Sequence, residues 1–266
     1  MTRAVASVLA AALILAAAPA SAQSADPKAR DIMEKNFFVS KVATLKIEST
    51  MLLIADKGQQ RERRNTVLIK LQPNGIDSKL VITFSTPADI RGTGVLQVEH
   101  IDGDDDLWIY LPALKKSRRL VASNKKDSFA GSDFSYGDIT LPKVDHYRHT
   151  LVRSEKLDGL DCHVVESVPA NDTVKSNSGY SKKVTWVRTD NFLEAQVEYY
   201  DLAGRLLKTQ RTGKHQLIDA GKQRWFALYR EMTNHQTGHR TTIDAAKAEA
   251  VAIADDVFTT RYLERE

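Results

Sequence analysis

Apolar and polar residues alternate along most of the chain, which is the pattern of half-buried β-strands. After Thr44, for example, Leu45, Ile47, Met51 and Leu53 share one face of a strand and lysine, glutamate and threonine occupy the other. Turn-forming residues separate such stretches. The pattern predicts strands over residues 44–53, 61–71, 79–85, 94–101, 106–111, 118–122, 147–157, 162–169, 182–187, 193–201, 205–212, 223–232 and 240–244.

Helical periodicity is rare by comparison. It predicts an amphipathic helix over residues 29–38 and a closing helix over 255–263, with irregular chain between 123 and 140. Strands joined by turns favour an antiparallel meander, so we expect a mainly β fold with a single strongly curved antiparallel sheet. The N-terminal helix and the irregular stretch are too short to cover that sheet fully. The uncovered apolar face would then leave a cavity.

The first 22 residues have the composition of a signal peptide. Arg3 precedes an apolar run over residues 4–18, and Ala20 and Ala22 form an A-x-A cleavage site. Removing this segment leaves 37 basic against 34 acidic residues, a net charge of +3, which is too weak to indicate nucleic-acid binding. We therefore expect one domain over residues 23–266, exported to the periplasm, with the lone Cys162 buried and unpaired.

Motifs for catalysis or metal binding are incomplete. The acidic run at 102–106 lacks the glycine and glutamate that a calcium loop needs, since Leu107 and Ala113 stand there, and it predicts a turn. His235 and His239 flank a glycine and indicate an exposed turn rather than a zinc-binding helix. Gly92–Gly94 and the 131–133 stretch match neither a dinucleotide nor a nucleophile motif. We expect no catalytic residue, no metal and no cofactor.

Two stretches are more informative. The apolar strand 106–112 is followed by four cations in five residues, Lys115, Lys116, Arg118 and Arg119. They form either a solvated turn or a basic rim suited to an anionic lipid headgroup, a membrane surface or an acidic partner. Between residues 127 and 138, three aromatic residues alternate with small and acidic ones: Phe129, Phe134 and Tyr136. Leaving them in water is costly, so they act either as a lid on the curved sheet or as part of its core.

These two stretches carry a resemblance to a known family. The segments 107–112, 118–119 and 131–138, followed by 157–162, Pro169, Trp186, 199–201, Gly204 and Lys208, resemble the bacterial outer membrane lipoprotein-sorting protein family. That family is related in fold to the LolA and LolB lipoprotein carriers. The resemblance implies a half-open β-barrel whose apolar concave face holds acyl chains under a helical or loop lid. It also implies that an inner-membrane exporter of the RND/MMPL type is a possible partner.

The leading hypothesis is therefore a periplasmic, non-enzymatic carrier of a lipid or lipoprotein acyl chain between the inner and outer membranes. The alternative is a ligand-free module that docks on an exporter or envelope complex, and an envelope hydrolase ranks last. Which face of the 106–111 strand points inward stays open, because both faces are apolar. The candidate cavity wall is Leu45, Ile47, Met51, Leu53, Val67, Ile69, Leu96, Val98, Trp108, Tyr110, Val184, Trp186, Val197 and Tyr199.

Overall fold

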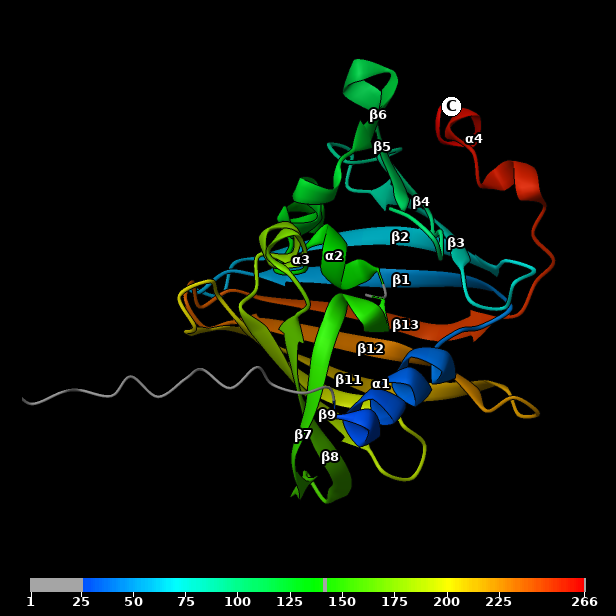
Figure 1. Ribbon diagram of the computed structural model, residues 1–266. Coiled ribbons are helices and arrows are strands. Elements are labelled where there is room, and N and C mark those ends of the chain that lie inside the picture. The colour runs from blue at the N-terminus through cyan, green and yellow to red at the C-terminus, as the bar shows by residue number, and fades with distance from the viewer. Residues whose placement is uncertain (1–25, 141–142, 266) are drawn as a thin grey trace, which may run out of the picture.

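The computed structural model describes residues 26–140 and 143–265, and the predicted signal peptide at 1–22 lies outside them (Figure 1). Thirteen antiparallel strands form one curved sheet, which confirms the predicted fold class. The strands are β1 Thr44–Ile54, β2 Gln60–Leu71, β3 Ser78–Thr86, β4 Gly94–Val98, β5 Asp106–Leu111, β6 Lys116–Leu120, β7 Tyr147–Leu157, β8 Leu160–Pro169, β9 Lys182–Arg188, β10 Glu194–Tyr200, β11 Leu206–Asp219, β12 Arg224–Asn234 and β13 Arg240–Glu249.

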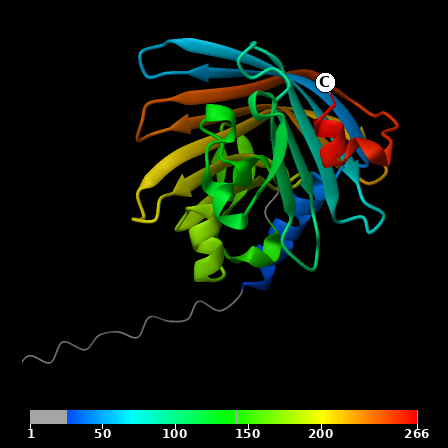
Figure 2. The same ribbon diagram turned by 90° about the horizontal axis from the view of Figure 1, so that it is seen from above.

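The order of the strands explains the position of the irregular segment. The sheet runs β6-β5-β4-β3-β2-β1-β13-β12-β11-β10-β9-β8-β7, so β1 pairs with β13 near its centre and β6 and β7 are its edges. These two edge strands are consecutive in the sequence. The chain between them, residues 121–146, must therefore pass from one edge to the other. Figure 2 shows the sheet curving around this crossing segment, which lies on its concave side.

The crossing segment consists of short helical turns rather than one helix. Three 3-10 turns, Ala122–Lys126, Phe129–Gly131 and Val144–His146, flank the one-turn helix α2, Tyr136–Ile139. Ser135 caps α2 by accepting a hydrogen bond from the Asp138 amide, and the Asp138 carboxylate accepts one from the Ser135 amide. This reciprocal capping fixes the direction in which the Asp138 side chain leaves the segment.

The helix α1, Pro27–Val39, covers the other end of the concave face and agrees with the predicted helix. Asp26 begins it by accepting hydrogen bonds from the Lys28 and Ala29 amides. The other carboxylate oxygen of Asp26 accepts the Leu151 amide, so the same residue ties the helix to β7. Its apolar face packs on β8 and β9 through a cluster of Ala29, Ile32, Val165 and Val187.

One predicted helix differs from the structure, and one helix of the structure was not predicted. Residues 255–263 form a 3-10 turn, Asp255–Val257, and the one-turn helix α4, Thr260–Leu263, instead of one helix. Phe258 and Leu263 of this C-terminal segment pack against the sheet, so tertiary contacts rather than helical periodicity determine its course. The helix α3, Asp172–Ser178, was not predicted. It is capped by the Asn171 side chain and ends at Gly179, whose φ of 76° suits glycine.

Candidate functional site

Over β1 to β5, aromatic side chains of the crossing segment cover part of the concave face. Phe129, Phe134 and Tyr136 of the crossing segment enter a core with Met51 and Phe84, and neither Phe129 nor Phe134 is more than 2 % exposed. The Phe129 ring lies 5.8 Å from that of Phe84 and 5.6 Å from that of Tyr136, measured between centroids. The three predicted lid residues therefore pack against the sheet in the described structure, and their movement remains a proposal.

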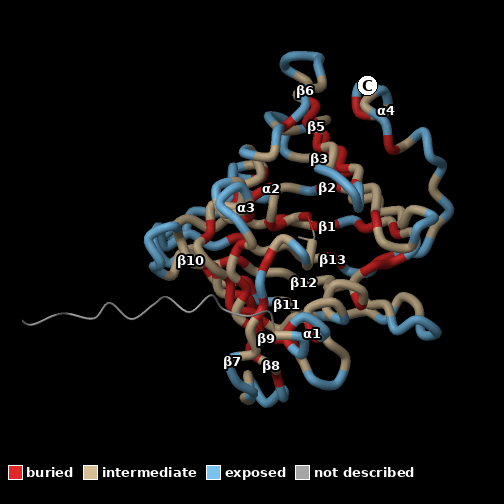
Figure 3. The backbone as a smooth tube through the Cα atoms, in the orientation of Figure 1, coloured by how far each residue is buried: buried red, intermediate tan, exposed pale blue. Residues whose placement is uncertain are grey.

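The centre of the sheet is less well covered. The strand β12 lies well inside the sheet, with seven strands on the β13 side and five on the β11 side. Met232 is nevertheless its one buried residue. Its apolar side chains, including Trp225, Phe226 and Leu228, are only half-buried, as the tan colour of β12 shows in Figure 3. A central strand normally buries such residues. Here Trp225 and Phe226 border cavities that side chains do not fill.

Two of these cavities adjoin each other on the concave face. One of about 130 Å³ lies over β12, β3 and β4, and one of about 110 Å³ lies between Phe129 and the strands β1 to β3. Both are mainly apolar. They share six lining residues, which come from three strands and the crossing segment: Ile69, Leu80, Ile139, Phe226, Ala227 and Arg230.

A larger cavity, about 590 Å³, lies beside α1. Phe37 and Phe38 of the helix face Ile76 and Ile101 across it. Two ion pairs lie at its rim: Arg30 with Asp145 at 2.6 Å, and Glu99 with the buried Lys41 at 2.5 Å. Burial raises the pKa of Glu99, against the opposing effect of the Lys41 ammonium. This cavity combines an apolar floor with ion pairs at its rim.

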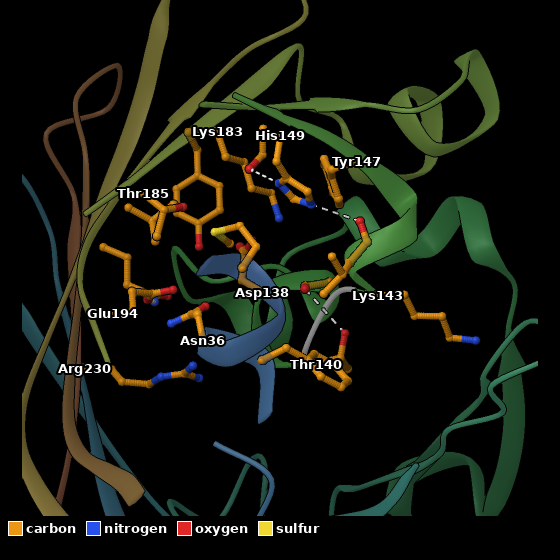
Figure 4. Close-up of a pocket in the computed structure, with 18 residues that line it drawn as sticks. Asn36, Asp138, Thr140, Lys143, Tyr147, His149, Lys183, Thr185, Glu194 and Arg230 are labelled. Atoms are coloured by element: carbon orange, nitrogen blue, oxygen red, sulfur yellow. Dashed lines mark hydrogen bonds between the residues drawn. The ribbon is translucent and has the colours of Figure 1, made fainter. Parts of the chain in front are cut away.

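Over β7 to β11 the concave face is polar and surrounds a cavity of about 80 Å³ (Figure 4). Asp138 lies at its edge, where its carboxylate is 2.6 Å from Lys208 Nζ and accepts a hydrogen bond from the Tyr180 hydroxyl. Burial alone would raise the pKa of Asp138, but the Lys208 and Lys183 ammonium groups outweigh it, and the pKa is lowered. Asp138 is therefore ionised and ties the crossing segment to β11.

Lys183 is buried in the same region, where its charge acts on Asp138 and Glu194. Its Nζ lies 4.9 Å from the ring centroid of Tyr147, 5.5 Å from that of Tyr180 and 5.3 Å from that of Tyr199. Lys183 is 8 % exposed, and among residues 26–140 and 143–265 its ammonium group makes no hydrogen bond or ion pair. Cation–π contacts with three tyrosine rings hold this ammonium group in the wall of the cavity.

His149 and Ser167 form a cross-strand pair in this wall. His149 Nε2 lies 3.0 Å from the Val144 carbonyl, which can only accept, so Nε2 carries the proton. Nδ1, 2.8 Å from Ser167 Oγ, then accepts the hydroxyl proton. Burial lowers the pKa of His149, which keeps the ring neutral. The pair joins β7, β8 and the end of the crossing segment.

The structure places eight of the fourteen predicted wall residues on the concave side. Leu45, Ile47, Met51, Leu53, Val67 and Ile69 contact the core or the adjoining cavities, and Val197 and Tyr199 border the polar cavity. This describes their positions, and their role in binding remains a proposal.

The other six predicted wall residues lie on the convex face, which corrects the prediction. Leu96, Val98, Trp108 and Tyr110 pack with Val81 under Phe258 and Leu263 of the C-terminal segment. Val184 and Trp186 pack with Cys162 and Val164. These strands are apolar on both faces, and short clusters on the outer face bury the residues that sequence alternation assigned to the inside. Val95, Leu107 and Ile109 are the inward residues of β4 and β5.

The four cations of the basic stretch lie away from the cavities. Lys115, Lys116, Arg118 and Arg119 are exposed on the hairpin that joins β5 to the edge strand β6. Arg119 pairs with Asp106 at 2.5 Å. Beside them Leu114 is 67 % exposed. The hairpin projects from the top of the molecule in Figure 1.

The remaining motifs behave as simple structural elements. Residues 102–105 belong to the turn before β5, and His235 and His239 are exposed in the β12–β13 turn, as predicted. Cys162 is buried and free, and burial raises the pKa of its thiol. Among residues 26–140 and 143–265, no group of three or more histidine, cysteine, aspartate or glutamate side chains is placed to hold a metal ion.

Comparison with known proteins identifies the family. A family model described only as an uncharacterized protein matches residues 76–265. The crystal structure of an outer membrane lipoprotein-sorting protein domain from Vibrio parahaemolyticus is 30 % identical over 90 % of this chain and 99 % of its own, with a TM-score of 0.81. This chain belongs to the outer membrane lipoprotein-sorting protein family. The resemblance of its motifs to that family is thereby confirmed.

Two further structures extend the lipoprotein-sorting family assignment. A DUF1329 family protein from Desulfovibrio piger is 30 % identical over 89 % of this chain and 98 % of its own, with a TM-score of 0.80. A LolA superfamily protein from Nitrosomonas europaea, 24 % identical over 88 % and 98 % of the two chains, has a TM-score of 0.67 and shows the shared fold. No curated protein sequence matches the chain. In the described part of the chain, no helix has the length and apolar character needed to cross a bilayer.

Proposed function

We propose that this protein is a periplasmic carrier that shields an acyl chain of a lipid or lipoprotein between the inner and outer membranes. The observation that carries the proposal is the pair of adjoining apolar cavities beneath the crossing segment, over a central strand whose apolar side chains stay half-buried. The family name, lipoprotein sorting, and the LolA superfamily fold support it. A binding role, rather than catalysis, also agrees with the names of these relatives.

The energetics of such binding suit a carrier. Transfer of one CH₂ group from water to an apolar site gains about 0.8 kcal/mol, so a chain of roughly 14 carbons gains on the order of 10 kcal/mol. Ordering the chain and displacing the crossing segment reduce this gain. The remaining affinity would be strong enough to keep the acyl chain out of water and weak enough to allow its release.

Uptake of a fluorescent fatty acid by residues 23–266 tests the proposal. Ala227 borders both apolar cavities, so Ala227→Phe should fill the space between them and weaken uptake at least tenfold. The matched control is Val152→Phe, since Val152 is 50 % exposed and borders neither cavity. Absence of uptake by the unmodified protein, or equal uptake by Ala227→Phe and the control, would contradict the carrier function.

We also propose that the β5–β6 hairpin contacts an anionic membrane surface during loading or delivery. Its exposed Lys116 and Arg118 lie beside the exposed apolar Leu114, a combination that suits a bilayer interface. Lys116→Glu with Arg118→Glu should abolish sedimentation of the protein with vesicles that contain phosphatidylglycerol. Sedimentation that is unchanged by these substitutions would exclude the hairpin. Neither the fold nor the comparisons support the RND/MMPL exporter, and it is not carried forward.

A further inference from the structure

Arg230 occupies a central position on the concave face. It extends from β12 and lines three of the cavities, the two apolar ones and the polar one. Figure 4 shows its side chain reaching from the sheet into the space in front of Glu194. Within the described residues no hydrogen bond or ion pair of its guanidinium group is recorded, although this group carries five donors. Arg230 is partly exposed, and its charge acts on Glu194, whose pKa it lowers. Its hydrogen-bond donors stay open to a ligand in the cavity.

Two further donors without partners lie in the wall of the cavity over β12. Gln97 Nε2 of β4 and Trp225 Nε1 of β12 are buried and have no hydrogen-bond partner in the described structure. Gln97 itself is 3 % exposed. Buried donors are nearly always satisfied, so unpaired ones require an explanation. Gln97, Trp225 and Arg230 together give this cavity three groups that donate hydrogen bonds, beside apolar residues such as Leu80, the cross-strand neighbour of Gln97.

The balance of charge around the polar cavity also favours a negatively charged ligand. Asp138 is neutralised by Lys208 at 2.6 Å, and Lys143 donates to the His100 and Gly103 carbonyls near the surface. Two cations, Lys183 and Arg230, then face one carboxylate, Glu194, around the polar cavity. Of these two cations Lys183 is buried and Arg230 is partly exposed, and burial makes an unbalanced positive charge costly. An anion bound beside Arg230 would remove the excess.

We propose that the cavity binds a single-chain amphiphile with its head inward, a negatively charged oxygen headgroup at Arg230 and an acyl tail directed toward Phe129. The headgroup accepts hydrogen bonds from Arg230 and from Gln97 and Trp225. The tail follows the adjoining apolar cavity along Ile69 and Leu80 to Phe129. The headgroup chemistry is that of a carboxylate or a phosphate. This inference rests on the proposed carrier function and specifies the ligand class and its orientation.

The test compares three ligands with one tail and different heads: hexadecanoic acid, hexadecyl phosphate and hexadecanol, measured by displacement of a fluorescent fatty alcohol. The wild-type protein should bind at least one of the two anions tenfold or more tightly than the alcohol, and the tighter anion identifies the headgroup. Arg230→Met should reduce that ratio to within about twofold and leave alcohol binding unchanged. Arg211→Met is the matched control, because Arg211 is 51 % exposed, pairs with Asp158 on the surface and borders none of these cavities.

Gln97→Leu provides a second variant if Arg230→Met fails to fold, since it removes a donor that has no partner among the described residues. It should lower the anion preference at least threefold. Alcohol binding as tight as anion binding, or an anion preference that survives in both variants, would overturn the head-inward site while leaving the carrier function intact. Failure to bind all three ligands would overturn both proposals.

Discussion

Asp138 and Lys208 form a buried ion pair, with Oδ2 and Nζ 2.6 Å apart and side chains 0 % and 6 % exposed. Asp138 belongs to α2 of the crossing segment and Lys208 to β11, so the pair joins the crossing segment to the sheet beneath it. Lys208 also donates to the Asp133 carbonyl at 2.9 Å. This single lysine therefore holds two points of the crossing segment.

Removing one partner of this pair should be strongly destabilising. Lys208→Met leaves the Asp138 carboxylate buried without its cation, and we expect a loss of about 3–5 kcal/mol in the free energy of unfolding, measured with urea. Asp138→Asn combined with Lys208→Met should recover most of this loss, because no charge is then left unpaired. A loss below about 1 kcal/mol for Lys208→Met alone would show that the pair contributes little.

Glu194 should make stability depend on pH in the opposite sense to most carboxylates. Burial raises its pKa above the ordinary value of 4.5, against the effect of Arg230 and of the Gln210 hydrogen bond. A raised pKa means that the folded state loses stability as pH rises from about 4.5 through the folded pKa. Glu194→Gln should therefore be more stable than the wild type at pH 7, with the difference vanishing near pH 4. A difference that is constant with pH would contradict this.

Gly94 gives a test of the C-terminal segment. A Cβ at this position would lie 2.8 Å from Leu263 Cδ2, so Gly94→Ala should destabilise by about 1–3 kcal/mol. Leu263→Ala alone should cost about 2–5 kcal/mol through loss of its packing. The double variant should cost clearly less than the two added together, because the clash is gone. Strict additivity in chemical unfolding would mean that α4 does not pack on β4 as described.

A reversible crosslink can distinguish a lid from a fixed plug. The Asp133 amide donates to Thr241 Oγ1 at 3.1 Å, and the Thr241 hydroxyl donates to Asp133 Oδ2 at 2.7 Å, so the two residues are in direct contact and a disulfide between cysteines at these positions is the crosslink to try. If the crossing segment is a lid, the oxidised Asp133→Cys, Thr241→Cys variant should take up a fluorescent fatty acid at least tenfold more slowly than its reduced form. Equal rates in both forms would identify Phe129, Phe134 and Tyr136 as a permanent part of the core.

The sequence predicted the sheet well because most strands carry a clear alternation and end at turn residues. The β7 bounds agree residue for residue with the predicted range, and β11 differs mainly in extending to Asp219. The pairing of β1 with β13 was not predictable from local pattern. The route of residues 121–146 was not predictable either. It follows from the pairing of β1 with β13, because this pairing leaves β6 and β7 at opposite edges of the sheet.

The site was predicted less well than the fold. Alternation shows that Trp108 and Ile109 face opposite sides of β5, but it cannot tell which side is concave when the C-terminal segment covers the other. The polar wall was missed for a related reason. Lys183 and Thr185 alternate with Val184 and Trp186, and the expectation of apolar residues inside placed the wrong set in the cavity. A lysine and a threonine between apolar residues were the available signal.

The central claim is that the concave cavity holds an amphiphile in the cell. Native mass spectrometry of residues 23–266, exported to the periplasm and purified without detergent, tests it most directly. The account predicts a bound species with the mass of an acyl-chain lipid, released by organic extraction and greatly reduced in Ala227→Phe. A bare protein mass for the wild type, or an adduct unaffected by Ala227→Phe, would contradict the account.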